Sequence, residues 1–281
     1  MPTYTAIITA YNAGKFIHHA IESVLAQTVP ALEIIVVDDG SSDNTEEAVR
    51  KFPVTYMHRR NGGPAAARNT GISHARGEWI AFLDHDDTWY PEKSEKQLSL
   101  ASADVDAVFC KKSPNMDNAS FLDMLEHNYG GNPSGTMIRR SVLESLHGFD
   151  EDRRLIGVDD YNLWLRFLLA GYHYVTTPQY YSFTPDTNHL GGNPERMLIG
   201  CLVNVDKVGE LAGLDPGIIK RRKQKLRRIY LPDLIAARKL RFARAQLLKA
   251  GLTTRDFCRY TVASFCPAWA LDLRRHICSK A

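Results

Sequence analysis

The 281-residue sequence has few cysteines, and none of them belongs to a recognisable site. No Cys-x-x-Cys pair occurs, and no cysteine has a zinc-like spacing from a histidine. The five cysteines are Cys110, Cys201, Cys258, Cys266 and Cys278. An odd number of scattered cysteines is typical of reduced thiols in a cytosolic protein. The sequence therefore argues against a disulfide framework and against a cysteine-based zinc site.

Long apolar runs and glycine-rich phosphate loops are also lacking. The longest uncharged stretch near the end of the sequence, Tyr260 to Leu271, contains a proline. It is far shorter than the roughly 20 residues that a membrane span needs. Neither GxGxxG nor GxxxxGK[ST] occurs, so nucleotide phosphates are not expected to be held as in dinucleotide-binding or P-loop proteins. These absences predict a cytoplasmic protein without a membrane span.

Acidic residues are scarce at one end of the chain. Residues 217–281 contain 17 Lys or Arg and 3 Asp or Glu, a net charge of +14. Residues 1–216 contain 18 Lys or Arg and 29 Asp or Glu, a net charge of −11. The tail is therefore expected to have a different partner from the body of the protein. Because the body is acidic and no known nucleic-acid-binding module is recognisable, nucleic acid is not expected as a partner.

The first hundred residues alternate between two kinds of pattern. Short apolar and β-branched runs are separated by segments with apolar residues at helical spacing. The predicted strands are 4–10, 33–37, 54–57 and 79–83, and the predicted helices are 15–27, 45–52 and 65–75. Such a series predicts an α/β fold with a mostly parallel sheet and helices on both faces.

Carboxylates gather directly after the apolar run Trp79 to Leu83. Asp84, Asp86 and Asp87 fall within four positions, with His85 between them. Parallel sheets bind ligands at the carboxyl ends of their strands. Carboxylates this close repel one another unless a cation lies between them, and oxygen ligands suit Mg²⁺ or Mn²⁺. The alternative is a polar turn in which an aspartate caps the next helix.

Five short motifs occur in order between residues 4 and 185. They are Thr9-Ala10-Tyr11-Asn12, Val37 to Asp43, Gly63 to Gly71, Asp84-His85-Asp86, and Asp159-Asp160 with Leu163 to Arg166. No single motif is specific, but together they resemble the inverting glycosyltransferases of family 2, which transfer a sugar from a nucleotide donor. The resemblance implies the GT-A fold, a Rossmann-like, mostly parallel sheet flanked by helices.

The resemblance places the nucleotide on the first two motifs. Thr9, Ala10, Tyr11 and Asn12 follow the first predicted strand, where backbone groups and the Tyr11 ring can hold a flat base. Asp39 follows the second strand and can accept a hydrogen bond from a uracil imide N–H, which favours uridine or thymidine donors over guanosine; a UDP-sugar is the donor predicted. Ordinary turn packing is the alternative for the tyrosine, and helix capping is the alternative for the acidic residues of the second motif.

The third and fourth motifs complete the implied donor site. Arg68 and Asn69 follow three consecutive alanines, which allow close packing against a ligand, and the arginine can reach the base or the diphosphate. A surface arginine is the alternative. Asp84 is expected at the ribose, and His85 is counted with the nucleotide-binding set although its side chain is expected to point away.

The metal is assigned to two residues. The resemblance makes Asp86 the ligand of a Mn²⁺ or Mg²⁺ ion that bridges the two phosphates and stabilises the departing nucleoside diphosphate. His189, in a glycine- and proline-rich loop from Thr184 to Pro194, is a second candidate contact to metal or phosphate. The loop is a candidate lid, and a solvated histidine is the alternative for His189.

Asp160 resembles the catalytic base of the family. In a single inverting displacement, one carboxylate removes the proton from the acceptor hydroxyl as it attacks the anomeric carbon. Many relatives have Glu-Asp where this chain has Asp159-Asp160, so the role of Asp159 is open. The alternative for either residue is a favourable interaction with the dipole of the following helix.

The predicted organisation has two parts. Residues 1–194 form a GT-A catalytic domain, with a nucleotide-binding half at 1–103 and an acceptor half at 104–194. Residues 195–281 form a basic helical region, with a long helical pattern interrupted at Pro232. Basic helices with aromatic residues favour an anionic membrane surface, so a peripheral position on the inner face of the cytoplasmic membrane is expected. A subdomain packed on the core and a homodimer interface are the alternatives.

The resemblance predicts transfer of one hexosyl or N-acetylhexosaminyl group from a UDP-sugar to a glycan or lipid-linked acceptor, in surface polysaccharide biosynthesis. Gln-x-x-Arg-Trp, expected of a processive synthase, is absent from the sequence. A nucleotidyltransferase is one alternative, but it would need a glycine-rich basic segment after the first strand. A non-catalytic nucleotide-sugar-binding protein is another, and the intact acidic set at 39, 84, 86 and 160 argues against it.

Overall fold

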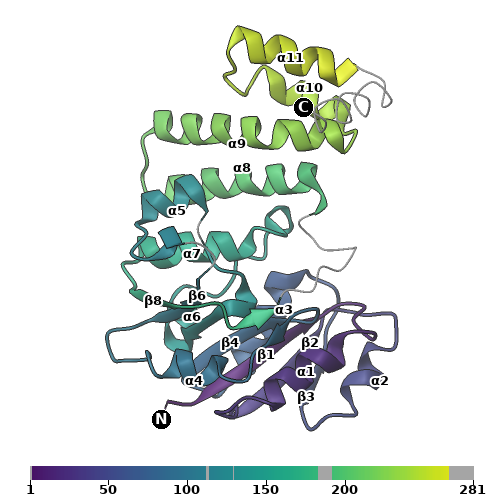
Figure 1. Cartoon of the computed structure of the whole chain (residues 1–281), viewed down its shortest axis with the longest axis vertical. Helices are drawn as coiled ribbons and strands as arrows, with labels where there is room; N and C mark the ends of the chain where they lie inside the picture. Colours follow the sequence, from purple (N-terminus) through teal and green to yellow (C-terminus); the bar gives the residue numbers. More distant parts are fainter. Residues whose placement is uncertain (1, 112–113, 129, 183–191, 266–281) are drawn as a thin grey trace, which may run out of the picture. The chain divides into compact units, whose positions relative to one another are not determined.

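The computed structural model describes residues 2–111, 114–128, 130–182 and 192–265. The chain divides into two compact units, Met1–His189 and Leu190–Ala281 (Figure 1). Each unit is described separately below. The candidate lid at 184–194 and its histidine, His189, lie almost entirely outside the described residues.

The first unit is built on a seven-stranded sheet in the order β3-β2-β1-β4-β7-β6-β8. Its strands are β1 Tyr4–Ala10, β2 Glu33–Asp38, β3 Thr55–His58, β4 Trp79–Asp84, β6 Ala107–Cys110, β7 Thr136–Arg139 and β8 Tyr174–Thr177. Strand β7 is antiparallel to both of its neighbours, and the other pairs are parallel. A second ribbon pairs β5 Thr88–Trp89 with β9 Tyr181–Ser182. The architecture confirms the predicted α/β class with a mostly parallel sheet.

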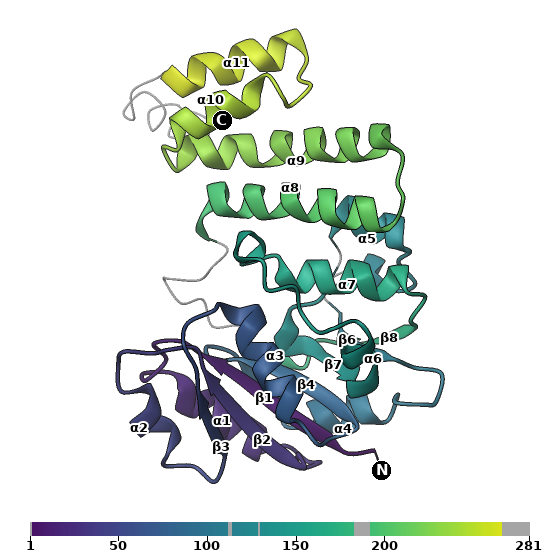
Figure 2. The same cartoon turned by 180° about the vertical axis from the view of Figure 1, so that it is seen from behind.

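Helices cover both faces of this sheet (Figure 2). Alternate residues of each central strand point to opposite faces, so Ile8 packs in one apolar cluster and Ile7 in the other. The first cluster includes residues of α1 Ile17–Leu25, α2 Thr45–Val49 and α4 Lys93–Leu98. The second includes residues of α3 Pro64–His74, α6 Arg140–Ser145 and α7 Asp159–Leu169. A further helix, α5 Phe121–His127, packs against α7.

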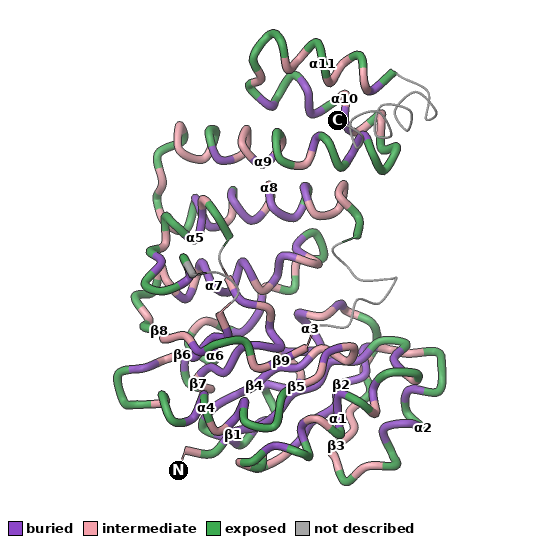
Figure 3. Tube along the Cα trace, viewed as in Figure 1, coloured by how far each residue is buried: buried purple, intermediate pink, exposed green. Residues whose placement is uncertain are grey.

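Strand β1, in the middle of the sheet, is buried at every one of its residues (Figure 3). Helix α3 packs against the Ile7 side chain of this strand at Gly71, where the helix itself has no side chain. A Cβ atom on Gly71 would come within 2.5 Å of the Ile7 Cγ2 atom. The absence of a side chain therefore brings α3, which carries Arg68 and Asn69, close to the sheet.

The second unit is helical throughout its described part. It contains α8 Pro194–Leu211, α9 Pro216–Ala236, α10 Leu240–Leu247 and α11 Thr254–Phe265, with α8 and α9 side by side (Figure 1). The predicted break at Pro232 is wrong, because α9 continues through that residue. Its neighbours Leu231 and Leu234 are buried, and this packing offsets the cost of a proline in a helix. No helix in the described part of the chain is long and apolar enough to cross a membrane.

Candidate active site

The carboxyl ends of β1, β2 and β4 meet at one edge of the sheet. Thr9 of β1 is paired with Asp84 of β4 and with Val37 of β2. The Thr9 hydroxyl lies 3.3 Å from the Asp84 Oδ1 atom. The first, second and fourth sequence motifs therefore converge, as expected when neighbouring parallel strands end together.

Arg68 lies between this edge and the start of α7. Its guanidinium donates one hydrogen bond to Asp159 Oδ2 at 2.5 Å and another to Asp84 Oδ1 at 2.8 Å. Burial acts to lower the pKa of Arg68, but the two carboxylates outweigh it and raise that pKa above its usual value. Both terminal nitrogens are thus engaged by protein carboxylates. This arrangement differs from the predicted contact of Arg68 with the base or diphosphate.

Asp160 is the second residue of α7 and is partly exposed, whereas its neighbour Asp159 is buried. The Tyr161 backbone N–H donates to its Oδ1 atom at 2.7 Å. Burial raises the pKa of the Tyr181 hydroxyl, and nearby acidic groups that include Asp84 and Asp160 act in the same direction. The candidate base and the acid at the end of β4 thus both lie near the Tyr181 hydroxyl.

Asp39 follows β2 and holds the turn before α3. Its Oδ1 atom accepts hydrogen bonds from the Arg59 guanidinium at 3.0 Å and from the Gly62 N–H at 2.9 Å. Its Oδ2 atom accepts from the Gly63 N–H at 2.7 Å. A carboxylate has about four acceptor positions, and donors of the described residues occupy three of them. The remaining one, on Oδ2, suits a single N–H donor.

The other residues of the first two motifs shape the turns. Asn12 has a positive φ of 50°, and its Oδ1 atom accepts from the Ser42 N–H at 2.9 Å. Asp38 is buried and accepts from the Ser41 N–H and the Tyr56 hydroxyl. In the first motif, Ala10 is buried and Tyr11 is half exposed. The tyrosine is thus the member of this motif that presents a ring at the surface.

Asn69 connects α3 to a distant loop. Its Nδ2 atom donates to the Phe149 carbonyl at 2.9 Å and to Glu151 Oε1 at 2.8 Å, and its Oδ1 atom accepts from the Phe149 N–H. These contacts bridge residues 80 positions apart. The predicted role of Asn69 at the nucleotide is therefore not reflected in its contacts, which position the loop that leads to α7.

The candidate metal residues lie in a tight turn after β4. The Asp87 N–H donates to the Asp84 carbonyl at 3.1 Å, and His85 and Asp86 between them are partly exposed. No group of three or more potential metal ligands occurs among the described residues. Two carboxylates fit Mg²⁺ or Mn²⁺, which proteins bind through one or two carboxylates together with substrate phosphates. His189 is not among the described residues, so its role stays a prediction.

A supporting layer beneath this turn was not predicted from the sequence. The Ser134 hydroxyl accepts from the Asp84 N–H at 3.1 Å, and the Ser134 carbonyl accepts from the Trp89 indole at 2.8 Å. The Lys93 ammonium lies 4.0 Å from the centre of that indole ring, and burial lowers the pKa of Lys93 to about 8. These residues come from three segments, and no sequence motif connects them.

A family model described as "Glycosyl transferase family 2" matches residues 5–161, more than half of the chain. The chain belongs to glycosyl transferase family 2. The match covers the first four sequence motifs and ends one residue after Asp160.

Relatives within the family share part of the chain. An uncharacterized glycosyltransferase of Rickettsia typhi is 32% identical over 195 residues, which are 59% of this chain and 59% of that protein. The succinoglycan biosynthesis protein ExoO of Rhizobium meliloti is 43% identical over 107 residues, which are 37% of this chain and 31% of that protein. The chain thus spans well under two thirds of the length of these curated relatives.

Solved structures share the fold over most of the chain. A mannosyltransferase from Pyrobaculum calidifontis, in complex with GDP-Man and Mn²⁺, superimposes with a TM-score of 0.65 at 23% identity, covering 100% of this chain and 80% of that one. Staphylococcus aureus TarS in complex with UDP-GlcNAc gives a TM-score of 0.57 at 18% identity, covering 93% and 79%. These likenesses establish the GT-A fold of this family 2 member.

Proposed function

We propose that this family 2 member is an inverting, metal-dependent glycosyltransferase that moves one sugar from a UDP-sugar to a hydroxyl group of a glycan or lipid-linked acceptor. The observation that carries the proposal is the position of Asp160. It is the second residue of α7 and follows Asp159, whose partner Arg68 is also bonded to Asp84 at the carboxyl edge of the sheet. A base and a donor-binding acid are thus brought together by one arginine.

The reaction follows from this placement. The acceptor hydroxyl oxygen attacks the anomeric carbon, and its proton passes to the Asp160 carboxylate. The bond from the anomeric carbon to the phosphate oxygen breaks, and its electron pair leaves with the nucleoside diphosphate. One displacement inverts the configuration, through an oxocarbenium-like transition state. Asp160 is partly exposed, which allows an acceptor hydroxyl to reach it.

A divalent metal fits the turn after β4. Asp86, with Asp84 beside it, would hold Mn²⁺ or Mg²⁺ together with the donor phosphates. When bound, the ion supplies a Lewis acid that neutralises charge on the leaving diphosphate. Arg68 does not supply that positive charge, because its terminal nitrogens are bonded to two protein carboxylates. The Mn²⁺ in the Pyrobaculum mannosyltransferase complex supports this proposal.

The Asp39 carboxylate supports uridine as the donor base. Its one remaining acceptor position, on Oδ2, matches the single imide N–H of uracil. Guanine would present two neighbouring donors, the ring N–H and the exocyclic amine, to a carboxylate with room for one. The related structures hold either a guanosine or a uridine donor, so the proposal of uridine rests on the contacts of Asp39 in this chain.

Calorimetric titration of nucleotides tests the donor. We expect UDP to bind at least about tenfold more tightly than GDP in the presence of Mn²⁺, a difference of roughly one well-placed hydrogen bond. Removing Mn²⁺ is expected to weaken UDP binding, because the diphosphate charge then lacks its counter-ion. Screening UDP-sugars for donor hydrolysis then identifies the sugar. Equal or tighter binding of GDP, or of UDP without metal, contradicts the donor assignment.

We further propose that the second unit binds an anionic membrane surface. Leu248, in the turn after α10, is 84% exposed, and Val262 and Phe265 on α11 are 64% and 66% exposed. Basic side chains flank these apolar residues, including Arg255 and Arg259, which are exposed on α11. Basic helices with exposed apolar residues bind the surface of anionic bilayers. A lipid-linked acceptor would be presented there, and the succinoglycan role of ExoO supports a glycan acceptor.

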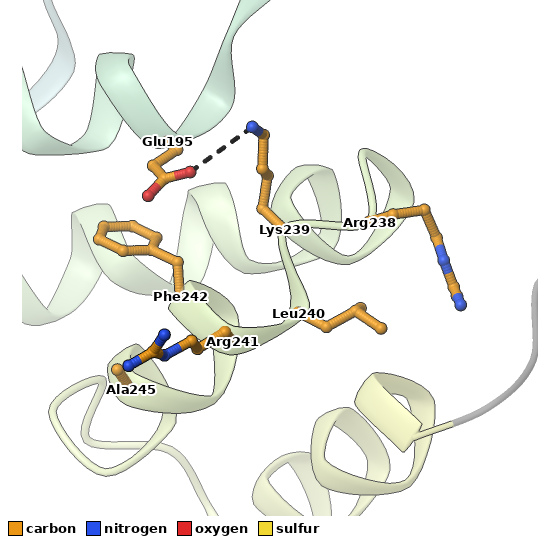
Figure 4. A pocket seen from close by; sticks show the side chains of 7 residues that line it. All are labelled: Glu195, Arg238, Lys239, Leu240, Arg241, Phe242 and Ala245. Carbon is orange, nitrogen blue, oxygen red and sulfur yellow. Dashed lines mark ion pairs between the residues drawn. The ribbon is translucent and has the colours of Figure 1, made fainter.

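A cavity of about 470 Å³ on this unit does not define a specific anion site. Lys239 is paired with Glu195 at 3.7 Å, next to the Phe242 ring (Figure 4). The Arg238 side chain points away from them in the same view. Because the cationic groups do not converge, distributed surface charge is the better basis for membrane binding.

Co-sedimentation with liposomes tests the membrane proposal. The full chain is expected to sediment with vesicles containing phosphatidylglycerol and not with pure phosphatidylcholine. Arg255→Glu/Arg259→Glu is expected to reduce binding at least about tenfold, since each basic residue near the surface contributes about 1 kcal/mol. Lys15→Glu/Lys96→Glu makes the same charge change at exposed positions of the first unit and serves as the control. Equal losses in both variants, or no loss in either, contradict the proposal.

A further inference from the structure

Arg68 is a buried arginine whose positive charge is paired with two carboxylates of the protein. Its side chain is 6% exposed, and that of Asp159 is 5% exposed. The two terminal nitrogens bond to Asp159 and Asp84, and the Nε atom is buried without a hydrogen-bond partner in the described part of the chain. A ligand-binding arginine would direct its terminal nitrogens toward the donor site. Here they join the start of α7 to the end of β4.

The surroundings restrict the arginine from several sides. The guanidinium carbon lies 5.2 Å from the centre of the Phe149 ring. The Phe149 backbone is hydrogen-bonded in turn to the Nδ2 and Oδ1 atoms of Asn69, the next residue of α3. Asp159 also receives the Gly157 N–H at 3.2 Å. The first residue of α7 is therefore tied both to the sheet and to the loop that precedes it.

We propose that Arg68 and Asp159 are a positioning pair, which holds Asp160 at a set distance from the donor-binding edge without contacting substrate. The inference rests on the proposed function, in which Asp160 is the base. It assigns Asp159 a role that the sequence left open. It also accounts for the two adjacent acids: the buried one fixes the start of the helix, and the partly exposed one is the proposed base.

The pair would affect catalysis because it fixes the start of α7, where Asp160 lies. Asp160 is adjacent to Asp159 in the chain, so a shift of the buried acid moves the base directly. A misplacement of about 1 Å can cost about 100-fold in rate. Removing Arg68 alone leaves the Asp159 carboxylate as an uncompensated buried charge, whereas removing both need not reduce stability. Stability and catalysis can therefore be separated by comparing single and double variants.

The experiment compares Arg68→Met, Asp159→Asn and the double variant by melting temperature, kcat and UDP affinity. Arg68→Met is expected to lower the melting temperature, and the double variant is expected to recover most of that loss. kcat is expected to stay about 100-fold below wild type in the double variant. Asp159→Asn is expected to keep UDP affinity within about threefold while kcat falls at least about tenfold. The control is Arg154→Gln, which removes an exposed arginine that is paired with Asp152. Its kcat and UDP affinity are expected to stay within about twofold of the wild-type values.

Two results would overturn the inference. A double variant with wild-type kcat would show that the pair only stabilises the fold. A loss of UDP affinity in Asp159→Asn as large as its loss of kcat would place the pair in donor binding. Asp160→Asn, assayed in parallel, separates this inference from the function on which it rests. An inactive Asp160→Asn with a fully active double variant refutes the positioning role alone, whereas an active Asp160→Asn refutes both.

Discussion

Asp160→Asn is expected to lower the rate of sugar transfer by about 10²–10⁴-fold, the usual contribution of a general base. The amide has nearly the same shape as the carboxylate but cannot take the proton of the acceptor hydroxyl. UDP binding is expected to stay within about twofold, because the donor site is built on Asp39, Asp84 and the strand ends around Thr9. Transfer is measured with saturating donor, and binding is measured by titration on the same preparation.

Asp104→Asn is the matched control for this experiment. It removes one carboxylate from an exposed position of the same unit, where the side chain accepts a hydrogen bond from the Ser102 hydroxyl. It is expected to leave transfer and UDP binding unchanged. Transfer by Asp160→Asn at close to the wild-type rate would remove Asp160 as the base. Equal losses of transfer and UDP affinity would instead assign Asp160 to donor binding.

Chelation of divalent metal is expected to reduce transfer by about 100-fold or more, with recovery when Mn²⁺ or Mg²⁺ is restored. A bound metal ion contributes several kcal/mol of charge stabilisation to the departing diphosphate, and each 1.4 kcal/mol corresponds to a factor of ten. Asp86→Ala is expected to raise the metal concentration for half-maximal transfer at least about tenfold. His189→Ala tests the second predicted metal contact with the same measurement.

The control for the metal experiment is Asp117→Asn, which changes an exposed acid that is paired with Lys111. Its metal dependence is expected to match that of the wild type. Full transfer in the presence of excess chelator would contradict the metal proposal. A metal requirement that does not change in Asp86→Ala would assign the ion to other ligands, and the comparison with His189→Ala then identifies whether the histidine is one of them.

Sequence patterns predicted the strand and helix order well because these patterns are local. Apolar runs located β1, β2 and β4, and two of the acidic clusters, at Asp38-Asp39 and at Asp84 to Asp87, occur at the ends of β2 and β4. They did not predict where α9 ends. Pro232 suggested a break, but the helix continues to Ala236, and Arg238 beyond it has a positive φ of 58°. Buried neighbours on one face of the helix outweigh the local preference of a single residue.

The sequence by itself determined the fold class, the family and the acids that gather at the sheet edge, since parallel strands with polar ends can meet in few ways. Only the tertiary structure showed which acids are bonded to distant segments of the protein and which are partly exposed. Arg68 and Asp159 are 91 residues apart, and Asn69 and Phe149 are 80 apart. Periodicity assigns a residue to a face of its own helix or strand. It does not assign that residue a partner in a distant segment, because the partner depends on how the elements pack.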